Sequence, residues 1–299
     1  MFLEDRPVLG IQLPGRKKII SGKVREVFDD GDGYLLMVAT DRISAFDVVM
    51  NEPIPDKGKI LTAMSAFWFC LTTHIVPNHF LTTELKDLPA EAQGRTMKIK
   101  RCKPLAVECI VRGYLAGSAW KQYQETGSVN DCKLPVGLME CQQLTEAIFT
   151  PTTKARRGHD LPLTTEQACE ILGKKLFSLV REKSLELYDF AHRYAKKKGI
   201  LIADTKFEFG LYENELMLID ELLTPDSSRF WPIEEYRVGR SQPSFDKQYL
   251  RDYLENTKWD KKPPPPKLPQ EVINNTRLKY IEAYEKITGN RWLCSHEGH

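Results

Sequence analysis

The sequence has almost no net charge and no long apolar segment. Its 43 lysines and arginines against 41 aspartates and glutamates leave a formal charge of +2 over 299 residues. General nucleic-acid and membrane-surface binders carry a clustered basic excess, so this balance argues against both classes while leaving room for a local phosphate pocket. No run approaches the roughly 18 apolar residues of a membrane helix, and residues 1–7 contain no apolar signal-peptide core. The sequence therefore predicts neither a membrane span nor a secretory leader.

Paired metal-ligand spacings are also missing. Seven cysteines include no CxxC pair, and six histidines include no HxxxH or HxH spacing. An odd number of cysteines without ligand spacing is typical of reduced thiols, so the sequence predicts a cytoplasmic protein. The GxSxG and GxxxxGK[ST] patterns of serine hydrolases and P-loop enzymes do not occur either.

What the chain does contain is the ordinary composition of a folded globular protein, with 41% hydrophobic and 28% charged residues. Its length allows a sizeable core, in one large or two medium domains. No internal repeat is visible in the sequence, so a repeat architecture is not expected.

Apolar periodicity predicts the main elements along the chain. A capping box of Thr164 and Gln167 begins a long helical region, which Gly173 is expected to divide. A four-proline linker at 263–266 precedes a final helix, whose apolar face predicts packing against the body. Residues 126–163 are expected to be irregular. The expected strands are 19–28, 34–40, 96–101 and 105–112, and the expected helices are 61–76, 164–198, 245–255 and 269–288.

The most informative stretch is Asp204-Thr205-Lys206-Phe207-Glu208-Phe209-Gly210. As a strand, it places Asp204, Lys206 and Glu208 on one face and the aromatic residues on the other. A polar tip and a second apolar run complete a hairpin, in which pairing about Asn214 sets Glu208 opposite Asp220. Two carboxylates directly across a ladder destabilise it, so this register predicts a cation between them. A register half a step away makes them diagonal neighbours, and two solvated acids at a hairpin end remain the alternative.

Three other stretches carry groups that suit anions. Ser21-Gly22-Lys23 can form a phosphate-covering loop, because glycine frees backbone N–H groups and lysine adds charge; a plain turn is the alternative. Gly117-Ser118 opens an expected helix near Arg112, which suits an anion site or a simple helix cap. Arg229 lies among hydroxyl residues and suits either phosphate recognition or a structural ion pair. The residues alone leave these alternatives open.

Five motifs carry a resemblance to one known family. They are Ser21-Gly22-Lys23-Val24-Arg25-Glu26-Val27, Asp41-Arg42-Ile43-Ser44-Ala45-Phe46-Asp47, the segment 104–118 from Pro104 to Ser118, the Asp204 to Gly210 strand, and Asp220-Glu221 with Thr224-Pro225-Asp226-Ser227-Ser228-Arg229. Over nearly its whole length the chain resembles phosphoribosylaminoimidazole-succinocarboxamide synthase (SAICAR synthetase), a ligase family of purine biosynthesis. Between the motifs it is similar to the single-function, fungal-type members.

The resemblance implies an ATP-dependent carboxylate–amine ligase. Carboxyaminoimidazole ribonucleotide (CAIR), L-aspartate and ATP would give SAICAR, ADP and phosphate through an acyl phosphate, with Mg²⁺ as the cofactor. The implied fold is α/β (α+β), kinase-like and related to ATP-grasp enzymes, with antiparallel sheets in two lobes and the ATP cleft between them. The implied divisions are a nucleotide-binding lobe at 1–110, a substrate and metal lobe at 111–240, and a helical segment at 241–299. The expected partners are these small molecules, with no nucleic acid or membrane, and the expected state is a monomer.

The resemblance also assigns roles to residues. Glu208 and Asp220 match the magnesium carboxylates, and Lys206 matches the catalytic lysine beside them. Asp41 and Asp47 belong to a substrate-side loop and are the candidates for the base that deprotonates the incoming amine. The residues expected to bind ATP are Ser21, Gly22, Lys23, Arg25, Glu108 and Lys206. Those expected to bind the other substrates are Arg42, Ser44, Arg112, Gly117, Ser118, Lys154, Ser228 and Arg229, with Arg112, Ser118 and Arg229 on the 5′-phosphate.

Activating a carboxylate with ATP requires positioning and charge neutralisation more than a protein nucleophile. The missing nucleophile motifs agree with this chemistry. One alternative is a kinase-like small-molecule phosphotransferase, but the sequence has no His-Arg-Asp catalytic loop. A non-catalytic nucleotide sensor is the other, and the complete set of acidic and phosphate-binding candidates argues against it.

Overall fold

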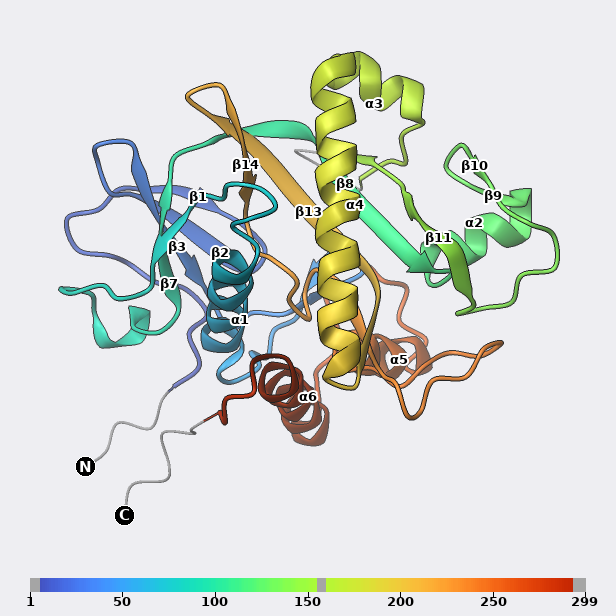
Figure 1. Ribbon diagram of the computed structural model, residues 1–299. Helices are drawn as coiled ribbons and strands as arrows, with labels where there is room; N and C mark the ends of the chain where they lie inside the picture. Colours follow the sequence, from blue (N-terminus) through green and yellow to red (C-terminus); the bar gives the residue numbers. More distant parts are fainter. Residues whose placement is uncertain (1–5, 155–159, 293–299) are drawn as a thin grey trace.

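The computed structural model describes residues 6–154 and 160–292, which form two main antiparallel sheets flanked by helices (Figure 1). The first sheet has the strand order β1-β2-β3-β7-β6. Its strands are β1 (Lys18–Ser21), β2 (Arg25–Asp29), β3 (Tyr34–Ala39), β6 (Phe80–Thr82) and β7 (Thr96–Lys100). Helix α1 (Lys57–Leu71) packs against this sheet and carries the buried side chains of Ile60, Met64 and Trp68.

The second sheet has the order β11-β8-β13-β14, with β12 paired to β8 and β15 paired to β13. Its strands are β8 (Lys103–Tyr114), β11 (Gln143–Phe149), β12 (Thr152–Thr153), β13 (Ile200–Tyr212), β14 (Glu215–Ile219) and β15 (Ser228–Pro232). The chain passes from one sheet to the other between Lys100 and Lys103, and the division into three domains remains a prediction. The short elements are β4 (Ser44–Ala45), β5 (Val48–Val49), β9 (Ser128–Val129), β10 (Cys132–Lys133) and the 3-10 turn Ala90–Ala92.

Three sequence expectations differ from these elements. The helix expected at 61–76 is α1, which begins at Lys57 and ends at Leu71. Residues 19–28 are not one strand, because the chain reverses after Ser21 and β2 pairs back onto β1. Residues 126–163 are not irregular throughout, since they contain β11 and three shorter strands. The alternation in β11 is weak, with only Leu144 and Phe149 buried, so the sequence carried little strand signal there.

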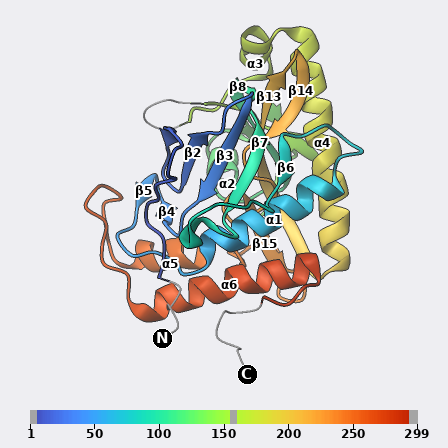
Figure 2. The same ribbon diagram turned by 90° about the vertical axis from the view of Figure 1, so that its left-hand side faces the viewer.

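Helix α4 (Lys174–Lys197) covers one face of the second sheet (Figures 1 and 2). It follows α3 (Thr165–Leu172), and the expected capping box and the division at Gly173 are both confirmed. The buried stripe of α4 includes Val180, Leu187 and Ala191, which belong to the same core cluster as Phe207 and Phe209 of β13. This packing fixes which face of β13 lies away from α4.

A bulge in β13 decides the orientation of its charged residues. Ile200 and Ile202 belong to the core cluster that contains α4, and so do Phe207 and Phe209. The residues that face this core are therefore even-numbered before Asp204 and odd-numbered after it. This change coincides with the register shift between Ile202 and Asp204. Beyond the bulge the even positions therefore lie on the opposite face of the sheet, which places Asp204, Lys206 and Glu208 there together.

The hairpin of β13 and β14 has the half-step register. Tyr212 pairs with Glu215, and Glu208 pairs with Ile219. Glu213 and Asn214 both have positive φ (50° and 66°), as a two-residue type I′ turn requires. The expectation that Glu208 lies directly opposite Asp220 is therefore wrong, and the half-step alternative is confirmed.

The last helix, α6 (Gln270–Thr288), packs beside α1, and Gly289 ends it in a left-handed conformation (Figure 2). Arg277 on α6 holds Asp56, the residue before α1, through a hydrogen bond of 2.8 Å from Nε to Oδ2. The expected packing of the final helix against the body is confirmed. The remaining helices are α2 (Ser118–Thr126) and α5 (Gln248–Asn256). Among the described residues, none of the helices combines the length and hydropathy needed to cross a bilayer.

Candidate active site

A row of charged side chains follows β13 on the face away from α4. Asp204, Lys206 and Glu208 project from this strand, and Arg112 projects from the neighbouring β8, paired with Asp204 in register. Positions 204 and 208 are separated by roughly 13 Å at about 3.3 Å per residue. Asp204 and Glu208 retain only 5% and 8% of their surface exposed, so this is a largely buried row of alternating charge.

At one end of the row, Asp204 is shared by two arginines. Arg112 Nη1 lies 3.2 Å from Asp204 Oδ2, and Arg229 contacts the same oxygen. Arg112 also donates to Thr150 Oγ1 at 3.0 Å and lies 3.5 Å from Ser118 Oγ. Burial lowers the pKa of Arg112, whereas Asp204 raises the pKa of Arg229. Both guanidinium groups pair with the one carboxylate of Asp204, and Asp246 is a further negative charge near Arg229. Two guanidinium groups side by side still suit an incoming anion.

Gly117 explains how the backbone reaches this pair. It has φ of 58°, and a Cβ built on it would lie 2.2 Å from Arg229 Nη2. The helix that follows begins at Ser118, so its first N–H groups also face this end of the row. Any side chain at position 117 would displace the Arg229 guanidinium and strain the backbone.

If Arg229 binds the 5′-phosphate of a ribonucleotide, as the resemblance implies, Gly117→Ala is expected to raise KM for that substrate by about tenfold and to leave KM for the nucleoside triphosphate unchanged, because the added methyl displaces the Arg229 guanidinium. Initial-rate kinetics with each substrate varied in turn measures this. Gly127→Ala is the matched control, since Gly127 follows the same helix with positive φ and open space around it. Equal increases in both KM values would contradict the assignment.

The middle of the row is an ion-pair network around Lys206. Its Nζ lies 2.6 Å from Glu108 Oε1 and 3.6 Å from Glu208 Oε1. Lys154 contacts the other oxygen of Glu208. Burial disfavours the charge on Lys206, but Glu208 and Glu108 outweigh it and raise the pKa of this lysine. Lys206 is thus a permanent cation between two carboxylates.

At the far end, Asp220 follows β14 with φ of 67° and meets Arg25 of β2. Arg25 also binds Glu221, so one guanidinium links the first sheet to the end of the hairpin. Burial opposes ionisation of Asp220, yet Arg25 outweighs it and holds the pKa of Asp220 well below its usual value. His79 Nε2 lies 3.2 Å from the Asp220 carbonyl oxygen, and burial lowers the pKa of His79 to about 4, so a neutral ring supports the turn.

The β1–β2 turn lies next to this end, but its contacts differ from the expected ones. The amide of Gly22 donates to the Arg25 carbonyl at 2.8 Å and is therefore used inside the turn. Lys23 is half exposed and pairs with Asp47. Arg42, expected to bind substrate, instead donates to the carbonyls of Gly22 (3.0 Å) and Lys23 (2.9 Å). We correct its role: Arg42 holds the turn from behind.

Two further expectations require correction. Asp41 is fully buried, and its oxygens accept from Val8 N–H (2.7 Å), Gly58 N–H (2.9 Å) and Arg95 (2.8 Å). These contacts give Asp41 a structural role and leave no free oxygen for a base. Ser228 is buried in β15, where its hydroxyl lies 2.8 Å from Thr205 Oγ1, so this hydroxyl already has a partner within the sheet.

A cavity of about 720 Å³ opens beside the arginine end of the row. Gly117, Ser118 and Arg229 line one side, and Ser44 to Asp47 line another. The beginning of α5 forms a further wall, with Lys247, Gln248 and Arg251. Sequence reasoning missed these α5 residues, although the pattern Asp246-Lys247-Gln248 before a helix could have indicated a charged helix start.

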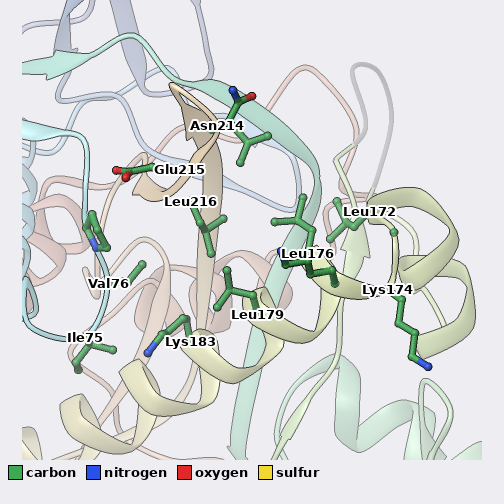
Figure 3. Close-up of a pocket in the computed structure, with 14 residues that line it drawn as sticks. Ile75, Val76, Leu172, Lys174, Leu176, Leu179, Lys183, Asn214, Glu215 and Leu216 are labelled. Atoms are coloured by element: carbon green, nitrogen blue, oxygen red, sulfur yellow. The ribbon is translucent and has the colours of Figure 1, made fainter.

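A larger groove of about 800 Å³ lies elsewhere, between α4 and the β13–β14 hairpin (Figure 3). Leucines 172, 176, 179 and 216 line it, and Lys174 points away from them (Figure 3). Its charged lining residues are exposed or half-buried, unlike the largely buried charges along β13; they are Lys174, Lys175, Lys183 and Glu215. We therefore place the candidate site along the charged row and its adjoining cavity.

The carboxylates Glu208 and Asp220 suit a magnesium ion that arrives with a nucleotide. Mg²⁺ is commonly held by one or two carboxylates, with substrate phosphates and water completing the octahedron. The described residues contain no cluster of three or more His, Cys, Asp or Glu that could hold a metal by itself. Two acids, flanked by Lys154, Lys206 and Arg25, therefore fit a shared metal–phosphate site better than a preformed protein cage.

Comparison with known proteins decides the family. A family model described as SAICAR synthetase matches residues 18–266. The chain belongs to the SAICAR synthetase family. The synthase of Trichlorobacter lovleyi is 53% identical over 293 residues, covering 95% of this chain and 99% of the relative. That of Thermodesulfovibrio yellowstonii is 52% identical over 288 residues, covering 94% and 98%. The similarity to fungal-type members thus extends to bacterial ones.

Solved structures similar to this chain are also SAICAR synthases. The SAICAR synthase of Saccharomyces cerevisiae, determined in complex with SAICAR, is 44% identical, with a TM-score of 0.87 over 97% of this chain and 100% of the yeast chain. A more distant SAICAR synthetase in complex with ADP is 24% identical, with a TM-score of 0.69 over 92% and 99%. The mixed α/β fold with antiparallel sheets, related to ATP-grasp enzymes, is confirmed.

Membership in the SAICAR synthetase family settles the reaction. The chain is a ligase of purine biosynthesis that makes SAICAR from CAIR and L-aspartate (EC 6.3.2.6). The kinase-like phosphotransferase is thereby set aside.

Proposed function

We propose that the charged row of β13 holds CAIR lengthwise, with its 5′-phosphate at Arg112, Ser118 and Arg229 and its carboxylate beside Lys206. The observation that carries this proposal is the order of charges along one strand: two arginines on Asp204 at one end, and Glu208 near Asp220 at the other. CAIR carries a 5′-phosphate at one end and a carboxylate on the imidazole at the other, and the row offers cations for both.

ATP is the second nucleotide of the reaction, in keeping with the ADP complex of a distant family member. Its place in this chain is at the first sheet, next to the far end of the row. Lys23 extends from the β1–β2 turn and Arg25 reaches the hairpin end, so both stand where polyphosphate oxygens would lie. Glu208 and Asp220 would hold Mg²⁺, which supplies charge neutralisation for the phosphates when bound.

The reaction then needs two steps. The CAIR carboxylate oxygen attacks the γ-phosphorus, and the bond to ADP breaks to give an acyl phosphate. The aspartate amine attacks the acyl carbon, and inorganic phosphate leaves with its electron pair. Lys206 stabilises the charge that develops at the reacting oxygens, because its cation is fixed by Glu108 and Glu208 before the substrates arrive.

The amine must lose a proton before or during its attack. Asp41 is buried and fully engaged, which leaves Asp47 as the candidate base. Asp47 lines the cavity and pairs with Lys23 of the β1–β2 turn, so it lies between the cavity and the proposed phosphate site. A monomer acting in the cytoplasm completes the proposal; the six described cysteines are all free, in keeping with a reducing compartment.

Replacing Arg229 with alanine is expected to raise KM for CAIR by about tenfold or more and to leave KM for ATP nearly unchanged, because one of the two guanidinium groups at the phosphate end is lost. Steady-state kinetics with each substrate varied separately measures the split. Arg237→Ala is a control that removes an arginine from the exposed loop after β15. An increase in KM for ATP alone would place Arg229 on the wrong side of the site.

The test of the whole proposal is the substrate dependence of ADP release. ADP is expected to form only when CAIR and L-aspartate are both present, with SAICAR in equal amount. ADP formed at the same rate without aspartate would contradict a ligase in which acyl transfer completes each turnover.

A further inference from the structure

A buried ion cluster lies behind the cavity, centred on Asp226. Its Oδ2 atom accepts from Lys57 Nζ at 2.8 Å and from Lys247 Nζ at 3.0 Å. Its Oδ1 atom accepts a hydrogen bond of 2.7 Å from the Tyr280 hydroxyl. Lys57 and Tyr280 are fully buried, and the Asp226 side chain is 2% exposed. Each oxygen of this carboxylate is therefore engaged.

The members of the cluster come from four separate parts of the chain. Lys57 begins α1, Asp226 precedes β15, Lys247 precedes α5, and Tyr280 lies in the middle of α6. Figure 2 shows α6 running beside α1 and below α5. The last helix thus reaches the interior behind the substrate cavity, although it contributes no side chain to the cavity wall.

Lys247 connects the cluster to the cavity. It lines the same cavity as Ser118 and Arg229, while its ammonium is tied to Asp226. Two ammonium groups share one carboxylate oxygen, so the orientation of that carboxylate decides where the Lys247 charge lies. Burial and the neighbouring Asp226 raise the pKa of Tyr280 well above its usual value, so its hydroxyl stays protonated and donates. Tyr280 thereby fixes the rotation of Asp226.

We infer that Tyr280 of α6 is a positioning residue for the ligase reaction, which acts through Asp226 to place the Lys247 ammonium at the wall of the CAIR cavity. The C-terminal helix is then part of the active-site support and not only a cover for α1. This inference rests on the proposed placement of CAIR along β13.

The first test is Tyr280→Phe in the full chain, which keeps the packed ring and removes only the hydroxyl. KM for CAIR is expected to rise about tenfold, while KM for ATP stays unchanged at a temperature well below the melting point of each variant. Tyr284→Phe, one turn further along the same helix and away from Asp226, is the matched control and is expected to leave both constants unchanged. Unchanged KM values for Tyr280→Phe would overturn the inference.

A double-mutant cycle separates positioning from general stability. Lys247→Met is expected to raise KM for CAIR by itself, because it removes the ammonium from the cavity wall. Asp226 keeps its pair with Lys57 in this variant. In that background, Tyr280→Phe is expected to have no further kinetic effect. Additive effects of the two substitutions would overturn the inference. A normal KM for CAIR in Lys247→Met alone would also overturn it, and this can be measured even if Tyr280→Phe cannot be purified. A normal KM for CAIR in the Arg229→Ala variant would instead refute the proposed placement of CAIR, whatever the result for Tyr280→Phe.

Discussion

Replacing Glu208 with glutamine is expected to lower kcat/KM by roughly a hundredfold or more, a loss of several kcal/mol of transition-state stabilisation. The amide keeps the shape of the side chain but removes the charge that pairs with Lys154 and Lys206 and that would hold Mg²⁺. Asp220→Asn is expected to have a similar effect, because it removes the partner of Arg25 at the same end of the row.

The measurement is kcat/KM at limiting Mg²⁺. Glu213→Gln supplies a matched control, since Glu213 is an exposed residue of the same hairpin turn. A near-normal kcat/KM for Glu208→Gln at limiting Mg²⁺ would remove the metal role from this residue and leave it as a structural partner of the two lysines.

Replacing Asp226 with asparagine is expected to lower the free energy of unfolding by about 3–5 kcal/mol. The change leaves Lys57 fully buried, and Lys247 nearly so, without their counter-charge. Urea denaturation and thermal melting measure the effect. Asp189→Asn is the control, because Asp189 pairs with Arg193 on the surface of α4, where both side chains are more than half exposed. A loss of less than about 1 kcal/mol for Asp226→Asn would mean that the cluster is held by packing alone.

The same cluster predicts a pH dependence of stability. Burial opposes ionisation of Asp226, but Lys247 and Lys57 outweigh it and hold the pKa of this carboxyl well below its usual value. A carboxyl whose pKa is depressed by folding contributes stability above its unfolded pKa, about 4, and this contribution is lost as the pH falls below that value. The melting temperature of Asp226→Asn should therefore fall less steeply between pH 5 and pH 2 than that of the wild-type chain (roughly the range over which the unfolded carboxyl titrates).

The sequence predicted best those features of the fold that depend only on residues close together in the chain. The capping box at Thr164 and the stop at Gly289 depend on neighbouring residues, so their positions follow from the sequence. The hairpin register did not, because Glu213-Asn214 lacks the Asn-Gly signal of a type I′ turn. The bulge between Ile202 and Asp204 also escaped notice, since it depends on the pairing with β15.

Side-chain partners were the least predictable part of the site. Arg42 and Asp41 occur in a loop motif that suits substrate binding, yet the tertiary structure gives Arg42 to backbone carbonyls and Asp41 to the core. Lys247 and Tyr280 lie far from every motif, and only the packing of α5 and α6 brings them to Asp226. Residue type indicates what a side chain can bind, whereas the fold decides which partner reaches it first.

The most direct test of the placement along β13 is a crystal structure of the chain with SAICAR and ADP. The 5′-phosphate should lie within hydrogen-bond reach, about 3 Å, of Arg112, Ser118 and Arg229, with the amide end beside Lys206 and Glu208. The ADP phosphates should lie between Lys23 and Asp220. SAICAR bound in the opposite direction, or in the groove of Figure 3, would contradict the account.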